Sequence, residues 1–162
     1  MTKNIQKGED NIQLQIWDTA GTEKYNSMGQ SFYRGAAACV LVFDLTVPES
    51  FQNVEQWRND FLSSLNPIGA EDYPFILVGN KTDMKDSIRV NNTDIETYCK
   101  EHNNMPYFAT SAKEDINLDE AFSKVADLAY ERRIKNEENF VPETKYLKVK
   151  KEEPKKGCCG KS

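Results

Sequence analysis

Two residues near the start of the chain have types and a spacing that could bind a phosphate and its metal ion. Asp18 ends a predicted strand, where its carboxylate could accept a hydrogen bond from a water molecule on Mg²⁺. Gly21 follows in a turn, and its lack of a side chain lets a backbone N–H approach an anionic oxygen. A strand-ending Asp followed by a turn Gly is also frequent for structural reasons, so this pair alone does not identify a site.

A second polar loop, Asn80-Lys81-Thr82-Asp83, follows the apolar run FILVG. The Asp83 carboxylate could accept two hydrogen bonds from the N1 and exocyclic amino edge of guanine, an edge that adenine does not offer. The stem of Lys81 could cover the face of the base, and Asn80 could tie this loop to a neighbouring one. The alternative is a polar turn after a strand, and the loop by itself does not separate the two interpretations.

The third loop, Thr110-Ser111-Ala112-Lys113, follows a short apolar run. The backbone N–H of Ala112 could meet a base oxygen, and Lys113 could flank the ring. Taken singly this loop is uninformative. All three loops follow predicted strands, however, and ligands bind at the carboxyl edge of an open α/β sheet.

The elements that would position these loops can be read from the apolar pattern. Residues 3–6 and 12–17 flank a Lys-Gly-Glu-Asp turn and predict a hairpin. Residues 37–45 and 75–79 are continuous apolar runs, which is typical of strands that are buried on both faces, and residues 107–109 form a short third run. These strands alternate with helical patterns, so the sequence predicts an α/β fold with a mostly parallel sheet.

The helical patterns begin at recognisable capping residues. Residues 46–49 combine a capping box with a proline in the first turn, and a weaker pattern predicts a helix over residues 93–101. Asn117 is predicted to cap a longer helix. The apolar face of the first helix comprises Phe51, Val54, Trp57, Phe61 and Leu65, and that of the last comprises Leu118, Ala121, Phe122, Val125, Leu128 and Ala129.

Composition narrows the function classes. The 162 residues have a net charge of −5 and could form one domain with a sizeable core. Residues 135–162 contain eight Lys and five Glu, so a basic tail follows an acidic body, which argues against general nucleic-acid binding and suits an anionic membrane leaflet. No apolar run is long enough to cross a bilayer and no signal pattern is present, so we expect the chain to stay in the cytosolic compartment, with Cys39 and Cys99 as buried free thiols.

The order of the three loops, each after a predicted strand, resembles the guanine-nucleotide arrangement of small GTPases. The strings WDTAGTEKY, FYRGA, LVFDLT, VGNKTD and TSAKE are similar to the Rab family, and YPFILVGNKTDM with NNMPYFATSAKEDINLDEAF resembles its late-endosomal and lysosomal branch. The resemblance covers residues 1–134, interpreted as a partial GTPase domain, and leaves residues 135–162 as a flexible tail. It implies a P-loop NTPase-like (Ras-like) sheet with helices on both faces, GTP/GDP and Mg²⁺ as ligands, and a switch in membrane traffic.

The same resemblance implies a lipid modification of the tail, a set of partner proteins and a location in the cell. Cys158 and Cys159 are similar to the double-cysteine endings that Rab proteins carry for two geranylgeranyl groups, and two lipid chains anchor far more stably than one. Farnesylation at Cys159 fits poorly because the two following residues are not aliphatic, and unmodified thiols would be a redox liability. The implied partners are an escort protein, geranylgeranyl transferase, an exchange factor, an activating protein and effectors. The implied location is the cytoplasmic face of late endosome, lysosome or vacuole membranes, cycling with the cytosol.

The sequence departs from the family in two places. No G-x-x-x-x-G-K-[ST] sequence occurs, so the first strand, the phosphate-binding loop, the following helix and the first switch of the family have no counterpart. We expect a truncated gene model or shortened transcript, of low stability because the loss of a central strand exposes apolar edges. Thr22 occupies the usual position of the Gln that orients the attacking water, which predicts slow hydrolysis. The effector or switch surface retains Trp17, Tyr25 and Phe32.

Two functions remain open. The first is a Rab-type GTPase in endosomal or lysosomal traffic. The second is a prenylated, nucleotide-free module that binds escort proteins or effectors without switching.

Overall fold

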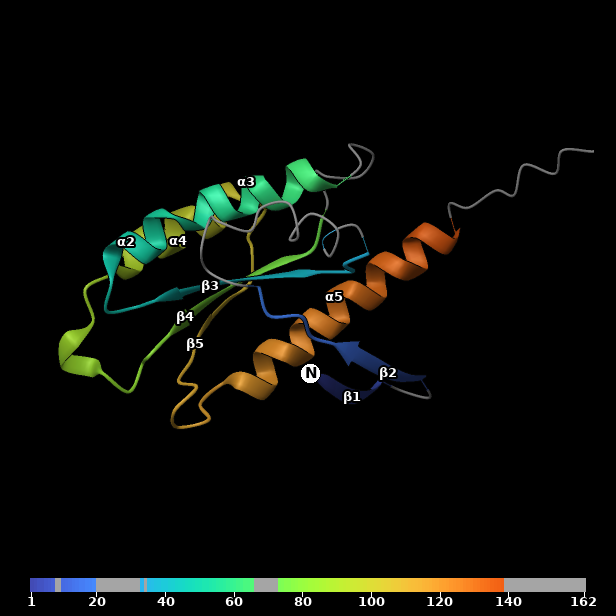
Figure 1. The fold of residues 1–162 in the computed structure, drawn as a ribbon, viewed down its shortest axis with the longest axis horizontal. Helices are drawn as coiled ribbons and strands as arrows, with labels where there is room; N and C mark the ends of the chain where they lie inside the picture. The colour runs from blue at the N-terminus through green and yellow to red at the C-terminus, as the bar shows by residue number, and fades with distance from the viewer. Residues whose placement is uncertain (8–9, 20–32, 34, 66–72, 139–162) are drawn as a thin grey trace, which may run out of the picture.

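The computed structural model describes residues 1–7, 10–19, 33, 35–65 and 73–138. Within these ranges three parallel strands form one sheet in the order β3 (Cys39–Asp44), β4 (Phe75–Asn80) and β5 (Tyr107–Ala109), as Figure 1 shows. Each strand lies inside or within one residue of the apolar run that predicted it. The parallel sheet expected from the sequence is therefore confirmed.

Helices cover both faces of this sheet. On one face lie α2 (Pro48–Gln52), α3 (Val54–Ser64) and α4 (Asn92–Glu101), and on the other lies α5 (Leu118–Glu138) (Figure 1). A 3-10 turn, η2 (Lys85–Ser87), follows β4. This arrangement confirms the Ras-like α/β fold. Among the described residues, none of the helices is both long enough and apolar enough to span a membrane.

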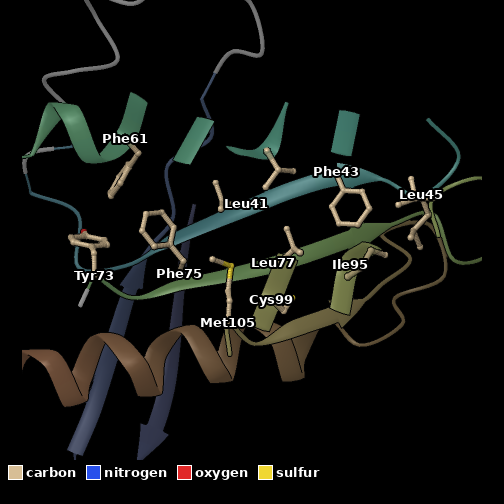
Figure 2. Close-up of a cluster of buried hydrophobic side chains, with 12 residues drawn as sticks. Leu41, Phe43, Leu45, Phe61, Tyr73, Phe75, Leu77, Ile95, Cys99 and Met105 are labelled. Atoms are coloured by element: carbon tan, nitrogen blue, oxygen red, sulfur yellow. The ribbon is translucent and has the colours of Figure 1, made fainter. Parts of the chain in front are cut away.

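Two apolar clusters hold the layers together, one on each face of the sheet. Side chains alternate across a strand, so Leu77 faces α3 and α4 while its neighbours Ile76 and Val78 face α5. Figure 2 shows the larger cluster gathered along β3 and β4. Its buried members are Leu41, Phe43, Leu45, Val54, Phe61, Tyr73, Phe75, Leu77, Val90, Ile95, Cys99 and Met105.

Gly79 is a glycine because the core closes over β4 at this point. A β-carbon there would lie 2.8 Å from the Tyr107 hydroxyl, 3.0 Å from Phe43 Cζ and 3.1 Å from Leu45 Cδ2. Only a residue without a side chain fits between these groups. The next residue, Asn80, begins the second polar loop, so the tight packing fixes the strand where that loop starts.

The helix boundaries differ from the predictions in three places. The capping box at residues 46–49 does not form, because Val47 is the N-cap of α2 and the Thr46 hydroxyl donates to Asp44 instead. The single helix predicted after it is divided at Asn53 into α2 and α3. At the other end, α5 continues to Glu138, four residues beyond the point where the apolar pattern ends.

The N-terminal hairpin forms as predicted but is separate from the parallel sheet. Its strands, β1 (Thr2–Lys7) and β2 (Asp10–Gln15), pair with each other in a sheet of their own and contain no fully buried residue. The hairpin lies beside α5 (Figure 1) and is joined to it by polar contacts. These are the ion pairs Lys3–Asp119 and Lys7–Asp127, the latter at 2.8 Å between Nζ and Oδ1, and a hydrogen bond from the Tyr130 hydroxyl to Asp10.

Because these contacts are partly exposed, docking of the hairpin should depend on salt. We expect Lys7→Gln to speed amide hydrogen exchange in β1 and β2 by roughly fivefold at low ionic strength, with the melting temperature almost unchanged. The same loss should appear in the unaltered chain at about 0.5 M NaCl. Lys100→Gln, at an exposed position on α4, is the matched control. Hairpin exchange that is insensitive to both salt and Lys7→Gln would contradict this account.

Candidate guanine-binding loops

The carboxyl ends of the three parallel strands bring polar residues to one edge of the sheet. In the strand register Asp44 at the end of β3 lies beside Asn80 at the end of β4, and Gly79 lies beside Ala109 at the end of β5. The second and third polar loops therefore start side by side, as expected for parallel strands.

Asn80 joins these two loops. Its Oδ1 atom accepts a hydrogen bond from the backbone N–H of Ala112 at 3.0 Å and one from the Thr110 hydroxyl at 3.5 Å. A backbone bond from Thr82 N to Thr110 O, at 3.0 Å, adds a further link. This geometry agrees with the expectation that Asn80 ties the loops together. It differs from expectation for Ala112, because the N–H predicted to meet a base oxygen here donates to Asn80.

Asp83 is held in place by Ser111. The Ser111 hydroxyl donates to Asp83 Oδ1 at 2.7 Å, and the same hydroxyl oxygen accepts from Glu114 N at 3.1 Å. Ser111 is fully buried, so its position is fixed by the core. The Ser111 hydrogen bond favours the ionised carboxylate and, against a smaller opposing effect of burial, holds the pKa of Asp83 below its ordinary value.

Removing the Ser111 hydroxyl should raise the Asp83 pKa toward that of an ordinary Asp. Asp83 would then become protonated at a higher pH, because the bond that stabilises its charged form is lost. A pH titration of the carboxyl carbon by NMR in Ser111→Ala measures the change. Ser123→Ala, at an exposed position on α5, should leave the Asp83 titration unaltered. An unchanged Asp83 pKa in Ser111→Ala would show that the hydroxyl does not stabilise the charge.

The two lysines of the loops lie in different settings. Lys81 has a positive φ of 73° and its ammonium lies 2.6 Å from Asp44 Oδ2. Lys113 is exposed beside Asp83, and its charge contributes to the lowered pKa of that carboxyl. A cavity of about 560 Å³, lined in part by Thr82, Asp83 and Asn117, opens next to the two loops.

Asp44 is a member of this cluster that sequence reasoning missed. Burial disfavours its ionised form, but hydrogen bonds from Lys81 and Thr46 outweigh this effect and lower its pKa. The signal was available, since Asp44 ends an apolar strand in the string LVFDLT, just as Asp18 ends another.

Asp18 is not brought to the cluster by strand pairing. It follows β2 in an exposed segment, and β2 pairs with β1 rather than with β3. Within the described residues no three acidic, His or Cys side chains gather closely enough to hold a metal ion, so Asp18 as a Mg²⁺ ligand stays a prediction. Trp17 is likewise exposed, at 61% of its surface. Other predicted site residues lie outside the described part of the chain: Gly21, Thr22, Tyr25, Phe32, Cys158 and Cys159.

Comparison with known proteins identifies the family. Residues 1–131 match the Ras family. The chain is 40% identical over 164 residues to "Ras-related protein Rab-7b" of Paramecium octaurelia, covering 98% of this chain and 78% of that protein. It is 42% identical over 163 residues to "Ras-related protein RABG3a" of Arabidopsis thaliana, with 98% and 77% covered, and 39% identical over 162 residues to "GTP-binding protein YPTC5" of Chlamydomonas reinhardtii, with 98% and 78% covered. The chain therefore belongs to the Ras family, and within it to the Rab7-like small GTPases.

Proposed function

We propose that this protein binds guanine nucleotides and regulates vesicle transport from endosomes to the lysosome or vacuole. The observation that carries the proposal is the joining of the second and third loops by Asn80–Ala112 and Asp83–Ser111 hydrogen bonds. These bonds hold the Asp83 carboxylate and the backbone at Ala112 together at one edge of the sheet. The names of two relatives, a GTP-binding protein and a Rab-7 protein, support the same function.

In this proposal each loop residue has a defined part in recognising the base. Asp83 accepts from the N1 and exocyclic amino groups of guanine, and the Ser111 hydrogen bond that lowers its pKa further favours the ionised form. The Lys81 stem and Lys113 flank the ring. The Ala112 N–H would donate to the base oxygen, and its present hydrogen bond to Asn80 Oδ1 would then be broken. Asp18 and Gly21 would serve the terminal phosphate and its Mg²⁺.

The remaining parts of the proposal rest on the family resemblance. Cys158 and Cys159 would carry two geranylgeranyl groups and anchor the protein to the cytoplasmic face of late endosomal, lysosomal or vacuolar membranes. Escort protein, transferase, exchange factor, activating protein and effectors would be its partners, with Trp17, Tyr25 and Phe32 on the surface that effectors contact. Thr22 replaces the water-orienting Gln, so hydrolysis of GTP would be slow without an activating partner.

A second function, a prenylated interaction module that binds no nucleotide, is favoured by a separate observation. Strand pairing does not bring Asp18, the residue predicted to serve the terminal phosphate, to the sheet edge where the guanine loops meet. Such a module would compete for escort proteins or effectors without switching.

A titration with fluorescent GDP and Mg²⁺ separates these functions. Submicromolar binding by the 162-residue chain, with competition by GDP and not by ADP, would support the nucleotide-binding function and exclude the module. Absence of binding at high micromolar GDP would contradict nucleotide binding by this chain. Equal competition by ADP would contradict the role given to Asp83.

A further inference from the structure

Lys81 of the guanine loop is held by a carboxylate from a different strand. Its ammonium lies 2.6 Å from Asp44 Oδ2, at the end of β3, and the strand register places Asp44 beside Asn80. The Asp44 side chain is 19% exposed and the Lys81 side chain is 49% exposed. The acid is therefore the more deeply placed partner, and the lysine reaches back to it.

Hydrogen bonds to Thr46 and Ser50 hold Asp44 in place independently of Lys81. Its Oδ1 atom accepts from the backbone N–H of Thr46 at 2.8 Å and from the Thr46 hydroxyl at 2.7 Å, which leaves Oδ2 facing the ammonium. Its backbone N–H donates to the Ser50 hydroxyl oxygen at 2.9 Å, and its carbonyl accepts from that hydroxyl at 3.1 Å. An ion pair with one partner already ordered loses less side-chain entropy when it forms than an ordinary surface pair does.

The backbone of Lys81 is the second observation. Five described residues other than glycine have a positive φ, and four of them are Asn or Asp, the types that tolerate this conformation. Lys81 is the exception, with φ of 73°. The ion pair with Asp44 is an interaction that can offset the free-energy cost of this backbone conformation.

We propose that Asp44 is a positioning residue of the guanine site, which holds the Lys81 ammonium so that the Lys81 stem covers one face of the base. This inference rests on the proposed function. Asp44 does not contact the nucleotide in this role. It acts through Lys81, by fixing one end of a stem that would otherwise sample many rotamers.

A merely structural role for Asp44, as the acceptor for Thr46, predicts a different outcome for substitutions. Asp44→Asn retains an oxygen that can accept from Thr46 but loses the ion pair. Lys81→Met retains the stem but loses the ammonium. Thr46→Val is the matched control, because it removes one hydrogen bond to Asp44 and leaves the Lys81 pair intact.

GDP affinity of the 162-residue chain, measured with fluorescent GDP and Mg²⁺, decides between the roles. We expect Asp44→Asn and Lys81→Met each to weaken binding by roughly fivefold, and the double variant to be no weaker than Lys81→Met alone. Thr46→Val should change affinity by less than about twofold. Independent losses that multiply in the double variant, or full affinity in Asp44→Asn, would overturn the proposal.

A measurement without nucleotide tests the anchoring of Lys81 by Asp44 independently of the proposed function. The ¹⁵N signal of the Lys81 ammonium should be protected from solvent exchange in the unaltered chain and in Thr46→Val, and should lose this protection in Asp44→Asn. If the unaltered chain binds no GDP but shows the protected signal, the proposed function fails while anchoring of Lys81 by Asp44 stands. An unprotected Lys81 signal in the unaltered chain overturns the anchoring itself.

Discussion

Replacing Asp83 by Asn should lower the affinity for GDP by roughly 100-fold without changing the fold. The substitution exchanges a carboxylate oxygen for an NH₂ group, which would face the N–H donors of guanine instead of accepting from them. The Ser111 hydroxyl can still donate to the remaining oxygen, so the loop keeps its anchor. Titration with fluorescent GDP measures the loss, and circular dichroism confirms that the variant is folded.

Two comparisons make this result specific. Asp86→Asn removes an exposed carboxylate three residues further along the chain and should leave GDP affinity within about twofold. Xanthosine diphosphate, which carries an oxygen acceptor where guanine has its amino group, should bind Asp83→Asn better than GDP does. If Asp83→Asn retains the affinity of the unaltered chain, Asp83 does not read the base.

The second and third loops were predictable because short-range patterns determine them. Continuous apolar runs place β4 and β5 inside the sheet, and the parallel direction then puts Asn80 and Thr110 at one edge. The contacts between the loops add detail that spacing could not give. Which hydroxyl meets Asp83, and which acceptor takes the Ala112 N–H, depends on packing around the buried Ser111.

The position of the hairpin was less predictable because its sequence specifies pairing within the hairpin and little beyond it. Exposed and half-buried residues alternate along most of β1 and β2 and give one half-buried face, which can pack on a sheet or on a helix. In the structure, charges on Lys3 and Lys7 match Asp119 and Asp127 on α5. Pairing between residues more than 100 positions apart cannot be read from one sequence, so the sequence alone does not show that β2 stays outside the parallel sheet.

β3 and β4 differ in how deeply the sheet buries them. Within the described residues β3 pairs only with β4, and Val42 on β3 is 60% exposed. β4, by contrast, lies between β3 and β5, with helices on both faces of the sheet. Every residue of β4 from Phe75 to Gly79 is buried. Stability should therefore depend far more on β4 than on β3.

Leu77→Ala should consequently destabilise the protein by about 3 kcal/mol, with a melting temperature lower by roughly 6–12 °C. Leu77 is 0% exposed and lies at the centre of the larger cluster, between Leu41 on β3 and the helices of the same face. Truncation removes apolar surface from the core and leaves a cavity that the surrounding strands cannot collapse. Because domains of this size are stable by only about 5–15 kcal/mol, this loss is a large fraction of the total.

Val42→Ala tests the same chemistry at the exposed edge and should cost less than about 0.5 kcal/mol. Urea unfolding, followed by circular dichroism, measures both variants under identical conditions. GDP affinity per folded molecule should be unchanged in Leu77→Ala, because Asn80 and Asp83 keep their bonds to Ala112 and Ser111. Equal losses of stability in the two variants would contradict a core centred on β4, whereas a selective loss of affinity in Leu77→Ala would show that packing under the strand transmits directly to the guanine loops.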